Sequence, residues 1–290
     1  MFKLYKKAFS YTNDGIVLAI PLAFFWWVIT LYIDYARAVV DTLPEMILSA
    51  ITMLFMSSAF CAGWFYMVKK SIRFSAKEFI LDSDRKHEAL KLIKTIPVGI
   101  GKFFLHYVTV SLLFVLMALS MVFLVKVLSA KYVTQINDIL AGYGIIANNM
   151  AEIELSLDKL PQDILLGLFD KIMIPALKLI SVVVSIPTIF SFLLMLWMPE
   201  IINTYKNPLL SIFTSIKKIF KNFAKSVNLY IYIAFIQMLI STAAPFALSN
   251  LFLYMLFMII YFYFIVYVVV LIFIYYDTIC RQNDKIQENS

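Results

Sequence analysis

The chain of 290 residues has a formal net charge of +7; 62% of its residues are apolar and 15% are charged. A soluble domain is nearer half apolar, with about a quarter of its residues charged, and it could not bury this much apolar surface. The composition therefore excludes an ordinary soluble domain and indicates a protein solvated by lipid. The basic residues lie mainly beside apolar runs, where anionic headgroups attract them, so we expect no nucleic-acid partner.

Six apolar runs are long enough to cross the bilayer core as helices, which takes about 20 residues. They are Gly15–Ile33, Met46–Val68, Ile96–Val125, Ile172–Met198, Leu229–Ser249 and Leu251–Tyr276. The runs are continuous, whereas strands of a membrane barrel alternate over about ten residues. The sequence predicts an all-α polytopic bundle with six transmembrane helices, forming one integral membrane domain over residues 1–290.

The lysines and arginines are distributed unequally over the connecting segments. Eighteen lie on the side that holds both termini and five on the opposite side, while Lys102 and Lys178 lie within the runs. The positive-inside rule then predicts cytoplasmic N- and C-termini. We expect the first run to be retained, because its apolar stretch is longer than that of a cleaved signal peptide.

A basic amphipathic segment precedes each pair of runs, at residues 2–11, 84–94 and 208–227. This pattern predicts three repeats of a basic surface helix followed by a transmembrane hairpin. The third segment is the clearest, since Asn207 suits a helix N-cap and Pro208 the first helical position. Its apolar residues form one stripe, and its lysines lie off that stripe: Lys217, Lys218, Lys221 and Lys225. We expect these lysines to contact anionic lipid headgroups; the alternative is a helix that binds a partner protein.

Residues 126–171 form an outer segment that is too polar to span the membrane. Its apolar residues recur at roughly helical spacing, and Gly142 and Gly144 interrupt them. We expect an extension of the third helix, a bend at the glycines and a second short helix. This outer cap either covers the protein's own outer face, or serves as a lid over a cavity or a docking surface for a partner protein.

The usual motifs of catalysis are absent from the sequence, including the Walker, HExxH, GxSxG and CxxC patterns. Cys61 and Cys280 lie in different environments, and the two histidines have no cysteine close in sequence, so neither a disulfide framework nor a zinc site is expected. We predict no catalytic residue, cofactor or metal site. An intramembrane lipid enzyme remains the minor alternative, and it would use acids at helix ends. Those acids are Asp34, Asp41, Glu45 and Glu200.

Ionisable groups inside the membrane are the candidates for a ligand or proton site. Lys102 and His106 lie four residues apart on one helix face, and Lys178 lies in the fourth run. The structural alternative is that both lysines snorkel to the headgroups and that the histidine hydrogen-bonds a neighbouring helix.

Prolines and glycines within the runs indicate places where helices bend. Pro97, Gly99 and Gly101 are expected to loosen the start of the third helix, and Pro175 and Pro187 to interrupt the fourth. Tyrosines along the sixth run need hydroxyl partners, which favours an inward-facing side and points to a polar cavity. They are Tyr261, Tyr263, Tyr267, Tyr275 and Tyr276.

Three stretches resemble a loose group of six-helix prokaryotic membrane proteins of unknown function. They are AGWFYMVKKSIR (Ala62–Arg73), PLLSIFTSIKKIFKNF (Pro208–Phe223) and YYDTICRQND (Tyr275–Asp284). The group includes the YciC-like families and the membrane domain attached to some glycerophosphodiester phosphodiesterases. The chain departs from it in a longer outer segment and in lacking a glutamate-and-glycine ending. The resemblance implies the fold and a prokaryotic plasma membrane, and no enzyme activity, because no phosphodiesterase domain is present.

These features predict a non-enzymatic plasma-membrane protein that acts in lipid or envelope handling or in small-molecule transport. The expected partners are membrane lipids with anionic headgroups at the cytoplasmic face. The alternative is a membrane scaffold or accessory subunit, whose outer cap would contact a partner protein.

Overall fold

The computed structural model describes residues 1–76, 90–145, 161–204 and 207–280. Within these ranges the chain is helical and contains no strand. Six of the described helical segments are long and apolar enough to cross a membrane. The predicted all-α architecture with six membrane-spanning segments is thereby confirmed. The chain is divided into two compact units, residues 1–113 with 193–290 and residues 114–192.

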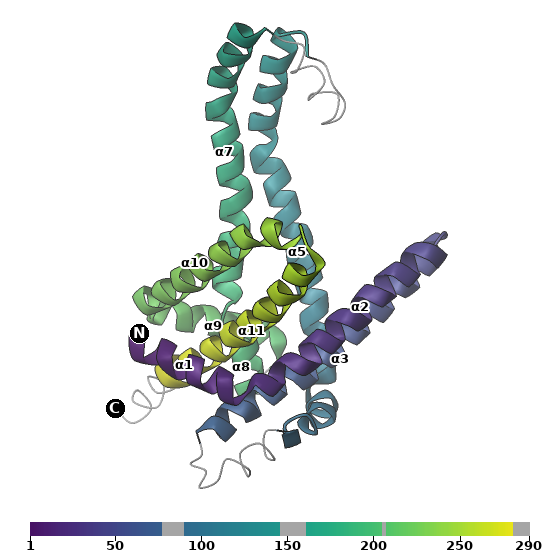
Figure 1. Ribbon diagram of the computed structural model, residues 1–290, viewed down its shortest axis with the longest axis vertical. Coiled ribbons are helices and arrows are strands. Elements are labelled where there is room, and N and C mark those ends of the chain that lie inside the picture. Colours follow the sequence, from purple (N-terminus) through teal and green to yellow (C-terminus); the bar gives the residue numbers. More distant parts are fainter. Residues whose placement is uncertain (77–89, 146–160, 205–206, 281–290) are drawn as a thin grey trace. The chain divides into compact units, whose positions relative to one another are not determined.

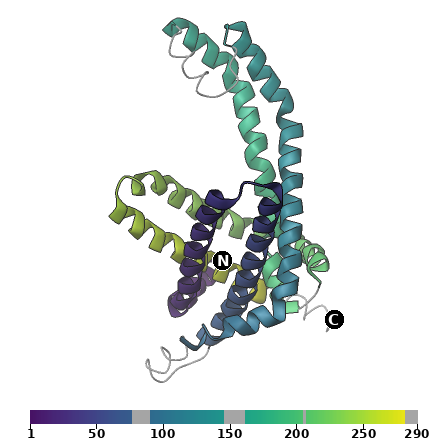
Figure 2. The same cartoon turned by 90° about the vertical axis from the view of Figure 1, so that its right-hand side faces the viewer.

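The first unit begins with α1 (Phe2–Asp14), a 3-10 turn at Ile16–Leu18, and α2 (Ala19–Val39). α2 lies beside α3 (Leu43–Ser75), as both views show (Figures 1 and 2). α3 begins at a capping box, because the Glu45 carboxylate accepts hydrogen bonds from the backbone N–H groups of Thr42 and Asp41. Residues 77–83 and most of the predicted basic helix 84–94 lie outside the described residues.

α5 (Thr95–Gly142) has 48 residues and, at 1.5 Å per residue, is about 72 Å long, more than twice the bilayer core. It begins without a break at Pro97 or the nearby glycines, which corrects the expectation that they loosen it. A Cβ at residue 99 would lie 2.8 Å from the Ala62 carbonyl oxygen and 3.0 Å from the Gly63 Cα. Gly99 and Gly63 therefore let α5 and α3 approach closely, as small residues do between membrane helices.

The second unit pairs the remainder of α5 with α7 (Gln162–Leu194), and both views show the two helices side by side. Its core consists of the buried residues Leu140, Ile145 and Leu168. The chain turns after Gly142, and Gly144 has a φ of 74°, a conformation that favours glycine. α7 begins ten residues before the predicted run and continues through its two prolines. The predicted short helix of the outer segment falls on residues 146–160, outside the described part.

The first unit continues with α8 (Trp197–Thr204), α9 (Pro208–Lys221), α10 (Phe223–Ala247) and α11 (Leu251–Tyr275), followed by a π-helical turn at Tyr276–Cys280. The predicted basic helix 208–227 is divided at Asn222, where α9 ends and α10 begins. α10 and α11 form one of the predicted hairpins, and the Asn250 side chain caps α11 by accepting a hydrogen bond from the Phe252 N–H. α1 packs along α11.

Candidate functional site

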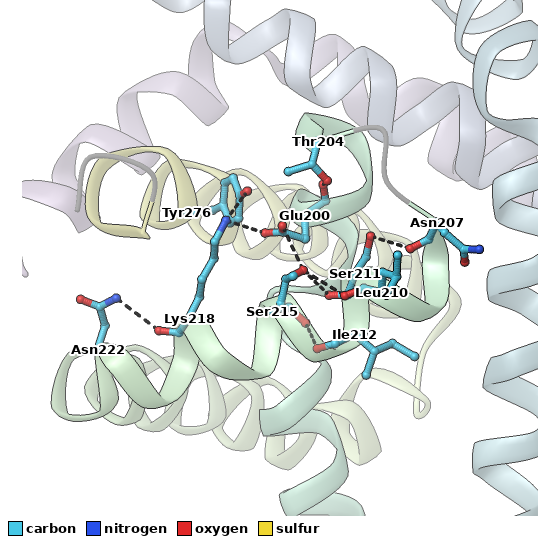
Figure 3. Close-up of polar contacts among 11 residues, drawn as sticks. Glu200, Thr204, Asn207, Leu210, Ser211, Ile212, Ser215, Lys218, Asn222 and Tyr276 are labelled. Atoms are coloured by element: carbon cyan, nitrogen blue, oxygen red, sulfur yellow. Dashed lines mark hydrogen bonds and ion pairs between the residues drawn. The ribbon is translucent and has the colours of Figure 1, made fainter. Parts of the chain in front are cut away.

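The first unit contains a buried polar cluster between α8, α9 and the end of α11 (Figure 3). Glu200 is 1% exposed, and its Oε2 lies 2.8 Å from the ammonium nitrogen of Lys218. The Thr214 hydroxyl donates to Glu200 Oε1, and Lys218 also donates to the Tyr276 hydroxyl at 2.9 Å. Both carboxylate oxygens thus have partners, which removes most of the cost of burying the charge.

The face of α9 that packs inward carries two small serines beside Pro208 and Ile219, and most of the apolar stripe lies off this face. Pro208, Ser211, Ser215 and Ile219 are buried. Four of the large apolar side chains of the helix are exposed, with Phe213 at 70%, and so are most of its lysines; the four are Leu209, Leu210, Phe213 and Phe220. The small serine side chains let the backbone of α9 approach neighbouring helices. Their hydroxyls donate hydrogen bonds to backbone carbonyls of the same segment.

Lys218 departs from the prediction for the four lysines of this segment. Lys217, Lys221 and Lys225 are exposed, whereas the ammonium of Lys218 is engaged by Glu200 and Tyr276. We expected Lys218 to contact lipid headgroups, but its ammonium group pairs with the Glu200 carboxylate instead. Burial lowers the pKa of Lys218, but the hydrogen bonds to Glu200 and Tyr276 outweigh burial and raise it above the usual value.

Two further polar contacts join α8 to its neighbours. The buried Lys69 of α3 donates to the Ile202 carbonyl at 2.7 Å, and the Trp197 indole donates to the Pro208 carbonyl at 3.0 Å. Together with the pair of Glu200 and Lys218, these bonds fasten α8 to α3 and α9, and Lys218 links α9 to Tyr276 in the π-helical turn after α11. These polar groups form hydrogen bonds to one another. We therefore interpret the cluster as one that holds the helices together rather than as a ligand-binding site.

A second feature of the first unit is a groove between α1, α10 and α11 with a volume of about 590 Å³, which we call the lateral groove. Its lining is dominated by hydrocarbon and ring surface. The lining residues are Phe2, Tyr5, Lys6, Phe9, Tyr232, Ile236, Leu239, Ile240, Ile260, Tyr263, Phe264 and Tyr267. Among them, Lys6 is the one charged side chain.

The tyrosines of the lateral groove use their hydroxyls within the protein. Tyr5 stacks on Tyr232 with ring centroids 4.0 Å apart and donates to the Asn228 side chain, while Tyr232 and Tyr267 share a hydrogen bond of 3.0 Å. Tyr263 donates to the side chain of Asn13. Burial, and then the neighbouring Tyr232, raises the pKa of Tyr5. Hence Tyr263 and Tyr267 of α11 find hydroxyl partners, but the cavity beside them is apolar rather than polar.

The predicted ionisable candidates do not form one site. Lys102 is exposed with its ammonium 5.7 Å from the centre of the Tyr66 ring, and His106 is half-buried beside the Phe103 ring. Lys178 belongs to the second unit, where it is exposed and lines a different, polar groove.

The acids that an intramembrane enzyme would need are also dispersed. Glu45 caps α3, Asp34 pairs with Arg37 at the exposed end of α2, and Glu200 is buried rather than a solvated helix terminus. In the part of the chain that the structure describes, no three His, Cys, Asp or Glu side chains are grouped as a metal site.

Two residue patterns in the sequence indicate the packed face of α9 and the α10 wall of the lateral groove, and neither was among the predicted sites. Ser211 and Ser215, four residues apart, mark the packed face of α9. Tyr232 and Ile236 on α10 repeat at helical spacing opposite the tyrosines of α11.

A scan against protein-family models, a search of curated proteins and a search of solved structures each found no match to this chain.

Proposed function

We propose that the chain is a non-enzymatic, multi-pass protein of the plasma membrane that handles lipid by binding an acyl chain of a membrane lipid in the lateral groove. The observation that carries the proposal is the pairing of the groove's tyrosine hydroxyls with protein atoms. A hydrocarbon chain entering the groove would leave none of these tyrosine hydroxyls without a partner, whereas a polar ligand would find few groups to bind.

The dimensions of the groove suit a segment of one acyl chain. Its α10 wall runs from Tyr232 to Ile240, nine residues that extend about 12 Å along the helix. Its volume of about 590 Å³ lies within the range of about 300–1,000 Å³ that is typical of ligand sites. Two of its walls are membrane-spanning helices, so the chain can enter directly from the bilayer.

The mouth of the groove favours a lipid with a negatively charged headgroup. α1 contributes Lys6 to the lining and carries the exposed Lys3 and Lys7 beside it. A phosphate near these ammonium groups gains roughly 1 kcal/mol from each. The outward-facing apolar residues and exposed lysines of α9 favour a second contact with the same interface. We place this interface, and both termini, on the cytoplasmic side because the basic residues gather there.

Native mass spectrometry of the protein released from its membrane tests this function. We expect a stoichiometric lipid on the parent protein and its loss in Ile236→Trp and Ile240→Trp, whose larger side chains fill the groove. Ile231→Trp is the matched control, because Ile231 lies on the same helix, is 61% exposed and is not part of the lining. Equal lipid occupancy in all four proteins would contradict the proposal.

A second candidate function, an accessory subunit, is favoured by the length of α5 and by the outer part of the second unit. Near the start of α7, Leu166 and Phe169 are 64% and 56% exposed. A stable partner protein that is lost from the purified complex in Leu166→Ser/Phe169→Ser would support this role.

A further inference from the structure

The second unit contains a polar groove of about 650 Å³ between α5 and α7. It is lined by Lys131, Tyr132, Thr134, Gln135, Asp138 and Lys178. Lys131, Gln135 and Asp138 follow one another at spacings of four and three residues, so they share one face of α5. Lys178 contributes a second ammonium group from α7. The groove therefore brings two positive charges and one negative charge to the same space.

Within the described part of the chain, the protein does not use these three charges itself. Among the residues that the structure describes, Lys131, Asp138 and Lys178 have neither an ion pair nor a side-chain hydrogen bond. All three are exposed. Their charges remain available to a ligand, in contrast to the satisfied pair of Glu200 and Lys218 in the first unit.

The groove begins at the headgroup layer, at Lys131 and Lys178, and extends outward from it to Asp138, which lies about 10.5 Å beyond Lys131 along α5. Residues 103–125 of α5 contain no Asp, Glu, Lys or Arg, and their 23 positions extend about 34 Å, close to the thickness of the hydrocarbon core. Lys126 follows directly, and Lys131 lies about 7.5 Å further along, within the polar layer. On α7, residues 179–194 are also free of these charged residues, which makes Lys178 the boundary of that span.

We propose that this polar groove binds the headgroup of a zwitterionic phospholipid, one that carries both a phosphate and an amine. Lys131 and Lys178 hold the phosphate, and the Asp138 carboxylate holds the amine. The Gln135 amide and the Thr134 hydroxyl add neutral hydrogen bonds. A purely anionic headgroup would satisfy the lysines but leave Asp138 facing a second negative charge. This site lies in a different unit from the lateral groove and is independent of the function proposed for it.

The test uses the full chain in nanodiscs that contain equal amounts of phosphatidylethanolamine and phosphatidylglycerol with identical acyl chains. Bound lipids are counted by native mass spectrometry. We expect the ethanolamine lipid to be enriched by up to about fivefold over the bulk, the upper end of what an exposed ion pair provides. In Asp138→Asn the enrichment should shift toward the glycerol lipid. In Lys131→Gln/Lys178→Gln the specifically bound lipid should be lost.

Lys126→Gln is the matched control, because Lys126 is an exposed lysine of the same helix outside the lining. It should bind lipid as the parent does. The substituted side chains are exposed, so the variants should retain the parent melting temperature, which is measured alongside. Identical lipid ratios in the parent, Asp138→Asn and the double variant would overturn the proposal. So would binding of soluble glycerophosphoethanolamine as tight as that of the lipid, since it would identify a free ligand.

Discussion

The ammonium nitrogen of Lys218 lies 2.8 Å from Oε2 of Glu200, a carboxylate that is 1% exposed. The two residues are 18 positions apart, on different helices, and their contact is one of the bonds that hold α9 against α8. The energetic consequence of such a pair is asymmetric: removing both charges costs little, whereas removing one leaves the other buried without a partner.

Lys218→Met is therefore expected to lower the free energy of unfolding by roughly 3–5 kcal/mol, because the Glu200 charge would stay buried alone. Glu200→Leu/Lys218→Met should recover most of this loss. Thermal unfolding in detergent compares the two variants with Lys217→Met, whose exposed lysine should change stability by less than about 0.5 kcal/mol. Equal destabilisation by Lys217→Met and Lys218→Met would contradict the interpretation.

Alkaline pH should weaken the same contact. The pKa of Lys218 is raised in the folded protein above its ordinary value of 10.5, so the folded state holds the proton more tightly than the unfolded state. The stability from this group is fully present below about pH 10.5 and is lost as the pH rises through the folded pKa. Melting temperatures measured from pH 8 upward should show the difference between the parent and Lys218→Met narrowing above that point. A constant difference across the alkaline range would exclude the charged pair as its source.

Gly99→Ala should destabilise the first unit by about 1–3 kcal/mol, since the added Cβ would meet backbone atoms of α3 that cannot move aside. Gly101→Ala should be neutral or stabilise by up to about 1 kcal/mol, because no atom lies within 4 Å of its Cβ position and alanine favours helix. Both variants are compared by thermal unfolding in detergent. The opposite order of melting temperatures would rule out a close crossing of α3 and α5 at Gly99.

The orientation that we propose is tested by labelling single cysteines in intact cells and in inverted vesicles, after Cys61 and Cys280 have been replaced by alanine. Asp41→Cys precedes α3 and should react with an impermeant maleimide from outside the cell. Lys217→Cys lies on α9 and should react only in inverted vesicles. Both positions are exposed in the structure. Reaction of both residues from the same side would refute the topology with cytoplasmic termini.

Much of the architecture could be predicted because a membrane imposes local constraints. In hydrocarbon each backbone group must be bonded within its own helix, so a continuous apolar run is sufficient to specify a span. The ends of the helices were less predictable. α5 and α7 extend well past their apolar runs, because side-chain packing around Leu140 and Leu168 supports helix where composition alone does not require it.

The sequence by itself determined that the chain is helical, that six segments can span a membrane and that its basic residues gather on one side. Only the tertiary structure decided which lysine is buried. Lys217 and Lys218 are neighbours of the same type, but each step along a helix turns the side chain by about 100°. That rotation directs Lys218 toward Glu200 and Tyr276 and Lys217 toward solvent. The partners come from α8 and from the π-helical turn after α11, which no local pattern in α9 could specify.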